Sequence, residues 1–226
     1  MPEFAILTVC SGNICRSPLA EQLLRAGLSD WTDLTVFSAG SVAMEGDRMP
    51  DEAATLALRY GGDPSAHAAR QLVEAHIRQA DLVLGMSREH RRAVVQLLPS
   101  ASRYTFTLRE FARLVAGATD DDFHEIAQLP PKDVGRRWTE AVDIAASNRG
   151  LQPAELPEDD DVIDPYREIR PCITCPQSSS SRRCRPSGPT SVVPRRRRSG
   201  NGGWAAFAES SAQKSQGAVE RGLDPT

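Results

Sequence analysis

The first clear hydrophobic pattern in the chain is a continuous apolar run of strand length over residues 4–9. A run without alternation is typical of a strand that is covered on both faces, as in a parallel sheet. Residues 10–13 end this run, and Pro18 stands where a helix can begin. Leucines at helical spacing follow and predict an amphipathic helix: Leu19, Leu23, Leu24 and Leu28.

The alternation of strand and helix continues as far as residue 147. We expect strands over 34–37, 80–84 and 104–106, and helices over 51–60, 88–98, 108–116 and 132–147. This order of elements and the length of the connections predict a doubly wound α/β sheet. Ligands of such sheets bind beyond the carboxyl ends of the strands, and Cys10 lies at the carboxyl end of the first strand.

The composition changes sharply after Arg167. The whole chain has 226 residues and a net charge of −3, but residues 1–167 carry 17 basic and 26 acidic side chains, whereas residues 168–226 carry 10 and 4. Proline, serine and arginine dominate 168–203, which predicts a disordered tail after one folded domain. Residues 204–221 have the pattern of a weak helix.

The chain shows no sign of a membrane or export segment. No apolar run reaches the ~18 residues of a membrane span. The N-terminus lacks a basic n-region, so we expect no secretory signal and a cytoplasmic location. Thiols stay reduced there, which makes a cysteine more often catalytic or inert than bridged.

The loop between the first strand and the first helix has the residues of an anion site. The N–H groups of such a loop and the N-terminus of the following helix together cradle a phosphate group. Gly12 gives the loop conformational freedom, and Arg16 can hold two phosphate oxygens at once. The same positive field favours the thiolate of Cys10, to which Ser17 can donate a hydrogen bond.

The segment Val9–Glu21 contains Cys-x5-Arg-Ser-Pro, and with it the chain resembles the low-molecular-weight protein tyrosine phosphatases. The second signature of that family is Asp-Pro-Tyr, present here as Asp164-Pro165-Tyr166. Further landmarks are Ser38–Gly40, His67–Leu72 and Ala80–Leu84. The resemblance covers residues 4–167 and implies a flavodoxin-like, four-stranded parallel sheet with helices on both faces.

The resemblance also implies a role for each motif residue. Cys10 would attack phosphorus and form a phosphocysteine, Arg16 would stabilise the transferring group, and Asp164 would protonate the leaving phenolate. Tyr166 would stack on the aromatic ring of the substrate. The loop would bind phosphate through Ser11, Gly12, Asn13, Ile14, Cys15 and Ser17. Neither metal nor cofactor would be needed, the partners would be phosphotyrosine-containing proteins, and we expect no binding to nucleic acid.

Alternatives to a tyrosine phosphatase stay open at this point. Relatives that hydrolyse phosphoarginine have threonine where this chain has Ile14, so we expect the tyrosine activity. An arsenate reductase of the same fold needs further cysteines in the middle of the chain, and none lies between Cys15 and Cys172. A phosphate-binding module without catalysis is disfavoured by the intact Cys10, Arg16 and Asp164. Cys15 is either a packing residue or a redox partner of Cys10. We expect surface or core roles for the four histidines: His67, His76, His90 and His124.

The C-terminal part departs from the family pattern. Relatives continue after Asp-Pro-Tyr into a C-terminal helix, whereas here Glu168–Pro171 leads into the Pro/Ser/Arg-rich tail with three of the five cysteines. The abrupt change resembles translation in a wrong reading frame, a hypothesis that resequencing of the locus would test. The sequence makes no prediction of the oligomeric state.

Overall fold

The computed structural model describes residues 3–119, 124, 126–130 and 133–164. The chain divides into two compact units, 1–163 and 164–226, and Asp164 is the described part of the second. The predicted tail over 168–226, its weak helix and Tyr166 lie outside the described residues.

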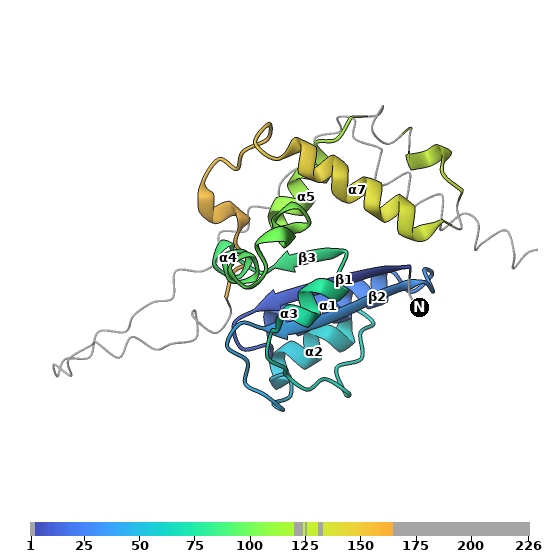
Figure 1. Ribbon diagram of the computed structural model, residues 1–226. Coiled ribbons are helices and arrows are strands. Elements are labelled where there is room, and N and C mark those ends of the chain that lie inside the picture. Colours follow the sequence, from blue (N-terminus) through green and yellow to red (C-terminus); the bar gives the residue numbers. More distant parts are fainter. Residues whose placement is uncertain (1–2, 120–123, 125, 131–132, 165–226) are drawn as a thin grey trace, which may run out of the picture. The chain divides into compact units, whose positions relative to one another are not determined.

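Four parallel strands form the sheet of the first unit, in the order β2-β1-β3-β4 (Figure 1). The strands are β1 (Phe4–Cys10), β2 (Leu34–Gly40), β3 (Leu82–Gly85) and β4 (Thr105–Thr107). The predicted four-stranded parallel sheet with helices on both faces is therefore confirmed. The strand order reverses between β1 and β3, so the carboxyl ends of these two strands form the switch point at which such sheets bind ligands.

Helices cover both faces of the sheet. The helices of the described part include α1 (Arg16–Gly27), α2 (Asp51–Arg59), α3 (Glu74–Gln79), α4 (Arg88–Leu97), α5 (Leu108–Ala116) and α7 (Val134–Asn148), of which α2 packs on α1. Short 3-10 turns occupy Pro99–Arg103 and Pro157–Asp160. None of the helices in the described ranges is both long and apolar enough to cross a bilayer.

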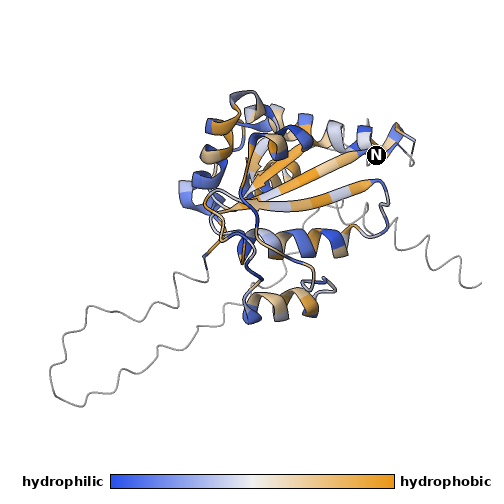
Figure 2. Ribbon diagram, turned by 60° about the horizontal axis from the view of Figure 1, so that its bottom comes forward, coloured by the Kyte–Doolittle hydropathy of each residue, from blue (hydrophilic) through white to orange (hydrophobic). Residues whose placement is uncertain are grey.

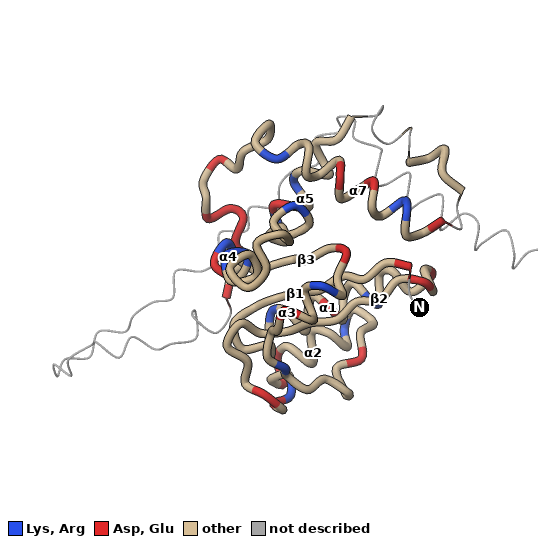
Figure 3. Tube along the Cα trace, viewed as in Figure 1, with Lys and Arg blue, Asp and Glu red and all other residues tan. Residues whose placement is uncertain are grey.

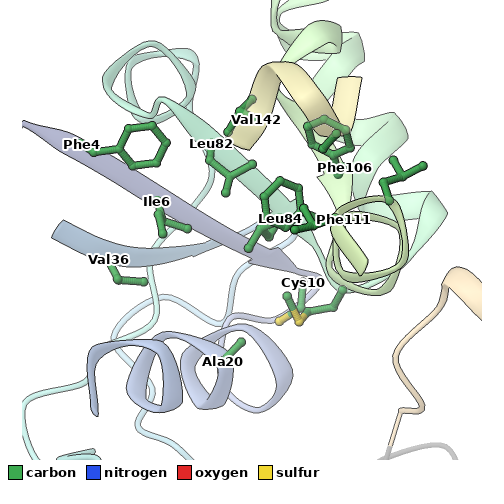
Figure 4. Close-up of a cluster of buried hydrophobic side chains, with 14 residues drawn as sticks. Phe4, Ile6, Cys10, Ala20, Val36, Leu82, Leu84, Phe106, Phe111 and Val142 are labelled. Carbon is green, nitrogen blue, oxygen red and sulfur yellow. The ribbon is translucent and has the colours of Figure 1, made fainter. Parts of the chain in front are cut away.

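The alternation of side chains along β1 divides the core into two layers. Phe4 and Ile6 face a cluster with α1, α5 and α7, while Leu7 and Val9 face a second cluster with α3 and α4. All seven residues of β1 are buried, as the apolar run predicts. Figure 2 shows the hydrophobic strands lying between the helices, and Figure 4 shows the first cluster, with Cys10 at the end of β1.

The sequence pattern did not predict the helix α3. It has six residues, and its N-cap position is Val73, which offers no side-chain hydrogen bond. Its one fully buried residue is Ile77, so tertiary packing onto β1 rather than a periodic pattern holds it in place. The last helix begins at Val134, two residues later than predicted, because the side chain of Asp133 caps it by accepting from the N–H of Arg136.

Candidate active site

The backbone of the loop after β1 turns its N–H groups to one side. The carbonyl oxygens of Cys10, Ser11 and Gly12 accept hydrogen bonds of 2.9–3.0 Å from N–H groups of the segment 41–44. Because each peptide bond is trans, the N–H groups of the following residues point away from that segment. These N–H groups and the N-terminus of α1, which begins at Arg16, therefore form the kind of cradle that binds an anion.

The end of β2 must pass close to this loop. A Cβ atom on Gly40 would lie 2.4 Å from the carbonyl oxygen of Ser11 and 3.0 Å from the backbone nitrogen of Asn13. Any larger residue would displace the loop, so glycine is required at this strand end. The side chain of Gln71 ties the segment after Gly40 in place, donating to the carbonyl of Ser41 and accepting from the N–H of Ala43.

Asn13 fixes the shape of the loop. It is fully buried and has a φ of +55°, in the left-handed region that asparagine tolerates better than most residues. Its side-chain Oδ1 accepts from the N–H of Arg70 at 2.9 Å, which settles the orientation of the amide. Its main-chain oxygen lies 2.7 Å from Nε2 of His67, and since a carbonyl only accepts, that nitrogen carries the hydrogen. The His67–Leu72 landmark thus acts as a support for the loop.

A buried chain of hydrogen bonds ends at the sulfur of Cys10. Glu21, as a carboxylate, can only accept, so Ser38 donates to it at 2.6 Å and in turn accepts from Nδ2 of Asn13 at 2.8 Å. The same Nδ2 donates to Ser17 Oγ at 3.0 Å. Ser17 is therefore free to donate its own hydrogen to Cys10 Sγ, 2.9 Å away. The chain therefore runs without a break from Glu21 to the sulfur of Cys10.

The two cysteines of the described part, neither of them in a disulfide, have different surroundings. Cys10 is 3% exposed at the end of β1. Cys15 is half-buried and packs against the small cluster of Met49, Ala53 and Ala57 between α1 and α2. This contact supports the packing role for Cys15, and its redox role stays a prediction.

A histidine that the sequence pattern did not single out reaches the loop. His90, in the first turn of α4, is 2% exposed, and its Nε2 lies 2.9 Å from Ser11 Oγ. Its Nδ1 lies 2.8 Å from the Oγ of Ser87, the N-cap residue of α4. Gly85 allows this approach, because a Cβ there would lie 2.9 Å from the nitrogen of Arg91. The spacing Ser-x-x-His could have marked a helix start, but not a contact with a residue 79 positions away.

The chain returns to the switch point just before Asp164. The N–H of Val162 donates to the carbonyl of Met86 at 2.8 Å, next to the end of β3. Asp161 accepts from the N–H of Arg88 at 2.8 Å and pairs with its guanidinium at 2.9 Å, and Asp160 pairs with Arg113. Figure 3 shows acidic positions, in red, beside α4. Asp164 follows two residues later in the sequence and is the first residue of the second unit.

The pair of Asp161 and Arg88 makes stability depend on pH. Burial raises the pKa of Asp161, but hydrogen bonds from Arg88 outweigh it and leave the pKa below its ordinary value. The pKa of an aspartate in the unfolded chain is about 4, and a lower pKa in the folded protein stabilises the fold above that pH. This contribution to the free energy of unfolding is lost as the pH falls through the pKa of the folded protein. We expect the melting temperature of the wild type to fall more steeply with acidification below about pH 4 than that of Asp161→Asn.

Thermal unfolding at a series of pH values would measure this difference, which we expect to be small because both side chains are partly exposed. Asp30→Asn, at an exposed aspartate in the turn after α1, serves as the control and should follow the wild type. An Asp161→Asn curve parallel to that of the wild type would show that the pair contributes nothing.

The structure brings the candidate residues of the loop together, whereas Asp164 belongs to the second unit. Side-chain contacts join Cys10, Asn13 and Ser17, with Ser11, Gly12, Ile14 and Cys15 in the same loop and Arg16 at the start of α1. Tyr166 lies outside the described residues. In the described ranges, no group of three or more His, Cys, Asp or Glu side chains has the arrangement of a metal site.

The comparison with known proteins agrees with these motifs. The model of the family described as "Low molecular weight phosphotyrosine protein phosphatase" matches residues 5–125. The low molecular weight protein-tyrosine-phosphatase Ptp of Acinetobacter johnsonii is 42% identical over 103 residues, which are 46% of this chain and 70% of the relative. A protein-arginine-phosphatase of Geobacillus stearothermophilus is 38% identical over 120 residues, 53% of this chain and 79% of the relative.

Solved structures include similar chains. The tyrosine phosphatase AmsI of Erwinia amylovora has 28% sequence identity and a TM-score of 0.44, over 66% of this chain and 93% of that one. The arginine phosphatase YwlE of Geobacillus stearothermophilus has 31% identity and a TM-score of 0.45, over 66% and 94%.

Proposed function

The chain belongs to the low molecular weight phosphotyrosine protein phosphatase family, and we propose that it hydrolyses phosphotyrosine in proteins through a phosphocysteine on Cys10. The observation that carries the proposal is the hydrogen-bond chain that ends at Cys10 Sγ, 2.9 Å from Ser17 Oγ. It supplies a stabilised nucleophile at the edge of a backbone cradle suited to phosphate. The function follows from this combination, because either feature alone occurs in proteins with other roles.

In the first proposed step the Cys10 thiolate attacks the phosphorus atom of the bound phosphotyrosine. The S–P bond forms and the P–O bond to the tyrosyl oxygen breaks. The loop N–H groups and the Arg16 guanidinium hold the three equatorial oxygens, whose negative charge must be stabilised in the transition state. Asp164, in its protonated form, gives its proton to the departing phenolate.

In the second proposed step water attacks the phosphorus atom of the phosphocysteine. The carboxylate of Asp164 takes a proton from that water, the new O–P bond forms, and the S–P bond breaks. Inorganic phosphate leaves, and Cys10 returns to the thiolate that Ser17 stabilises. Support for the role of Asp164 comes from the Asp-Pro-Tyr motif that begins with it.

The proposal extends to the substrates and the compartment. Phosphotyrosine-containing proteins are the proposed partners, with Tyr166 stacking on the phenyl ring. A reducing compartment such as the cytoplasm suits a mechanism that needs a free thiol at Cys10. An arsenate reductase is the weaker proposal, because the chain has no further cysteine between Cys15 and Cys172 to carry the redox steps.

Turnover of para-nitrophenyl phosphate, followed by a panel of phosphopeptides, tests the proposed function. We expect activity that persists in EDTA and is inhibited by vanadate, which resembles the transferring phosphoryl group. Absence of turnover in a folded protein, or turnover that EDTA abolishes, would contradict the proposal.

A second candidate, hydrolysis of phosphoarginine, is favoured by the similarity to the Geobacillus stearothermophilus enzyme. The side chain at position 14 separates the two candidates. Ile14 Cγ1 and Met44 Cγ lie 3.5 and 3.6 Å from the place where a Cβ of Gly12 would be, so apolar groups flank the loop there. An apolar surface suits an aromatic leaving group and leaves the N–H groups of a guanidinium without a partner.

We expect the wild type to prefer phosphotyrosine to phosphoarginine peptides, and Ile14→Thr to shift the ratio of kcat/KM about tenfold towards phosphoarginine, as one hydrogen bond of 1–3 kcal/mol permits. Ile14→Val is the matched control, since valine has the shape of threonine without its hydroxyl. An equal shift in both variants would assign the effect to shape. A wild-type preference for phosphoarginine would replace tyrosine by arginine as the substrate and leave the phosphatase chemistry unchanged.

A further inference from the structure

The histidine at the switch point, His90, contacts the phosphate loop but has no step in the proposed reaction. The imidazole is buried between the carboxyl ends of β1 and β3, and each ring nitrogen lies within 2.9 Å of a serine hydroxyl. One of these, Ser11, directly follows the proposed nucleophile and is exposed. The other, Ser87, is the N-cap residue of α4.

Which group donates at each position depends on the tautomer of the ring, and we assign the neutral ring the tautomer with its hydrogen on Nε2. Ser87 Oγ accepts from the N–H of His90 at 3.4 Å, so its own hydrogen can go to Nδ1 of the neutral ring. The ring hydrogen is then on Nε2, which donates to Ser11 Oγ. In a protonated ring Nδ1 donates to Ser87, and Nε2 still donates to Ser11. In the assigned neutral tautomer and in the protonated ring, Ser11 Oγ accepts from Nε2 of His90, and its hydroxyl hydrogen points away from the ring.

We propose that His90 is a positioning residue that turns the hydroxyl of Ser11 into a hydrogen-bond donor for an acceptor oxygen of the bound substrate. The backbone of Ser11 is fixed at the same time, because its carbonyl accepts from the N–H of Val42 at 3.0 Å. With its backbone and Oγ both held, the exposed hydroxyl loses little freedom on binding, which is the condition for a hydrogen bond to contribute to affinity. The inference rests on the proposed phosphatase function for the identity of the substrate.

The proposed hydrogen bond from Ser11 to the substrate contributes to binding more than to the chemical step. Ser11 Oγ is bonded to His90, whereas the sulfur of Cys10 is bonded to Ser17. A donor that contacts ground state and transition state alike changes KM and leaves kcat unchanged. A purely structural role of His90 would instead disturb the loop and lower kcat and the melting temperature together.

The test compares His90→Gln with His90→Asn, together with Ser11→Ala. A glutamine amide can reach the position of Nε2 and donate to Ser11, whereas the shorter asparagine can reach only the position of Nδ1. We measure Kd for a peptide with a non-hydrolysable phosphonate analogue of phosphotyrosine, and kcat and KM for the phosphopeptide. We expect Kd and KM to rise about five- to tenfold in Ser11→Ala and His90→Asn, and to stay near wild type in His90→Gln.

The double variant Ser11→Ala/His90→Asn completes a cycle that isolates the coupling. We expect it to bind no more weakly than Ser11→Ala alone. The inference is overturned if Ser11→Ala leaves Kd unchanged, or if His90→Asn and His90→Gln give the same Kd. It is also overturned if the changes in binding free energy of Ser11→Ala and His90→Asn add up in the double variant. Kd for the non-hydrolysable peptide is measured without turnover, so the two claims can fail separately. A wild type that is inactive but shows the expected order of Kd values would contradict the proposed function and still support the inference.

Discussion

Cys10→Ser is expected to lower the turnover of any phosphate monoester by far more than about a hundredfold, because loss of a nucleophile usually has an effect well above 10². A serine hydroxyl ionises much less readily than a thiol, so the hydrogen bond from Ser17 cannot generate a comparable nucleophile at neutral pH. Initial rates with para-nitrophenyl phosphate in wild type and variant measure the effect.

Binding provides the control for this variant. The backbone cradle and Arg16 are untouched by the substitution, so Cys10→Ser should keep its melting temperature and bind phosphate or vanadate measurably. A folded variant with more than about a hundredth of the wild-type activity would show that Cys10 is not the nucleophile.

Asp164→Asn has the second largest expected effect. An amide cannot protonate the leaving phenolate, so we expect rates to fall by ~10²–10⁴ for substrates with poor leaving groups and much less for activated ones. A series of aryl phosphates of graded leaving-group acidity measures the dependence. Glu158→Gln removes an exposed carboxylate of the same acidic stretch and should leave the series unchanged. Equal loss across the series would make Asp164 a structural residue.

The sheet and the loop could be predicted from the sequence because each depends on residues close together in the chain. The apolar run over 4–9 needs no partner to be recognised as a strand covered on both faces, and it is buried throughout. The loop that follows contains its own glycine, arginine and serine, and the expected bond between Ser17 and Cys10 is present at 2.9 Å. The four-stranded parallel sheet follows from the alternation of such local patterns.

The support of the site could not be predicted in the same way, since it depends on contacts between distant residues. Ser38 is 25 residues from Asn13, and His90 is 79 residues from Ser11, so no local pattern links them. His90 was expected in a surface or core role, and it is a core residue, but its polar partner lies in the phosphate loop. The order of hydrogen bonds from Glu21 to Cys10 also requires the geometry of three separate elements.

The central claim is that Cys10 carries the phosphoryl group during the reaction. Rapid mixing of enzyme and phosphotyrosine peptide, an alkaline quench in denaturant and mass spectrometry of the digested protein test it most directly. The account predicts one added phosphoryl group on the peptide that contains Cys10, present at milliseconds and gone once the substrate is consumed. A phosphoryl group on another residue, or full turnover with no labelled peptide at any time, would contradict it.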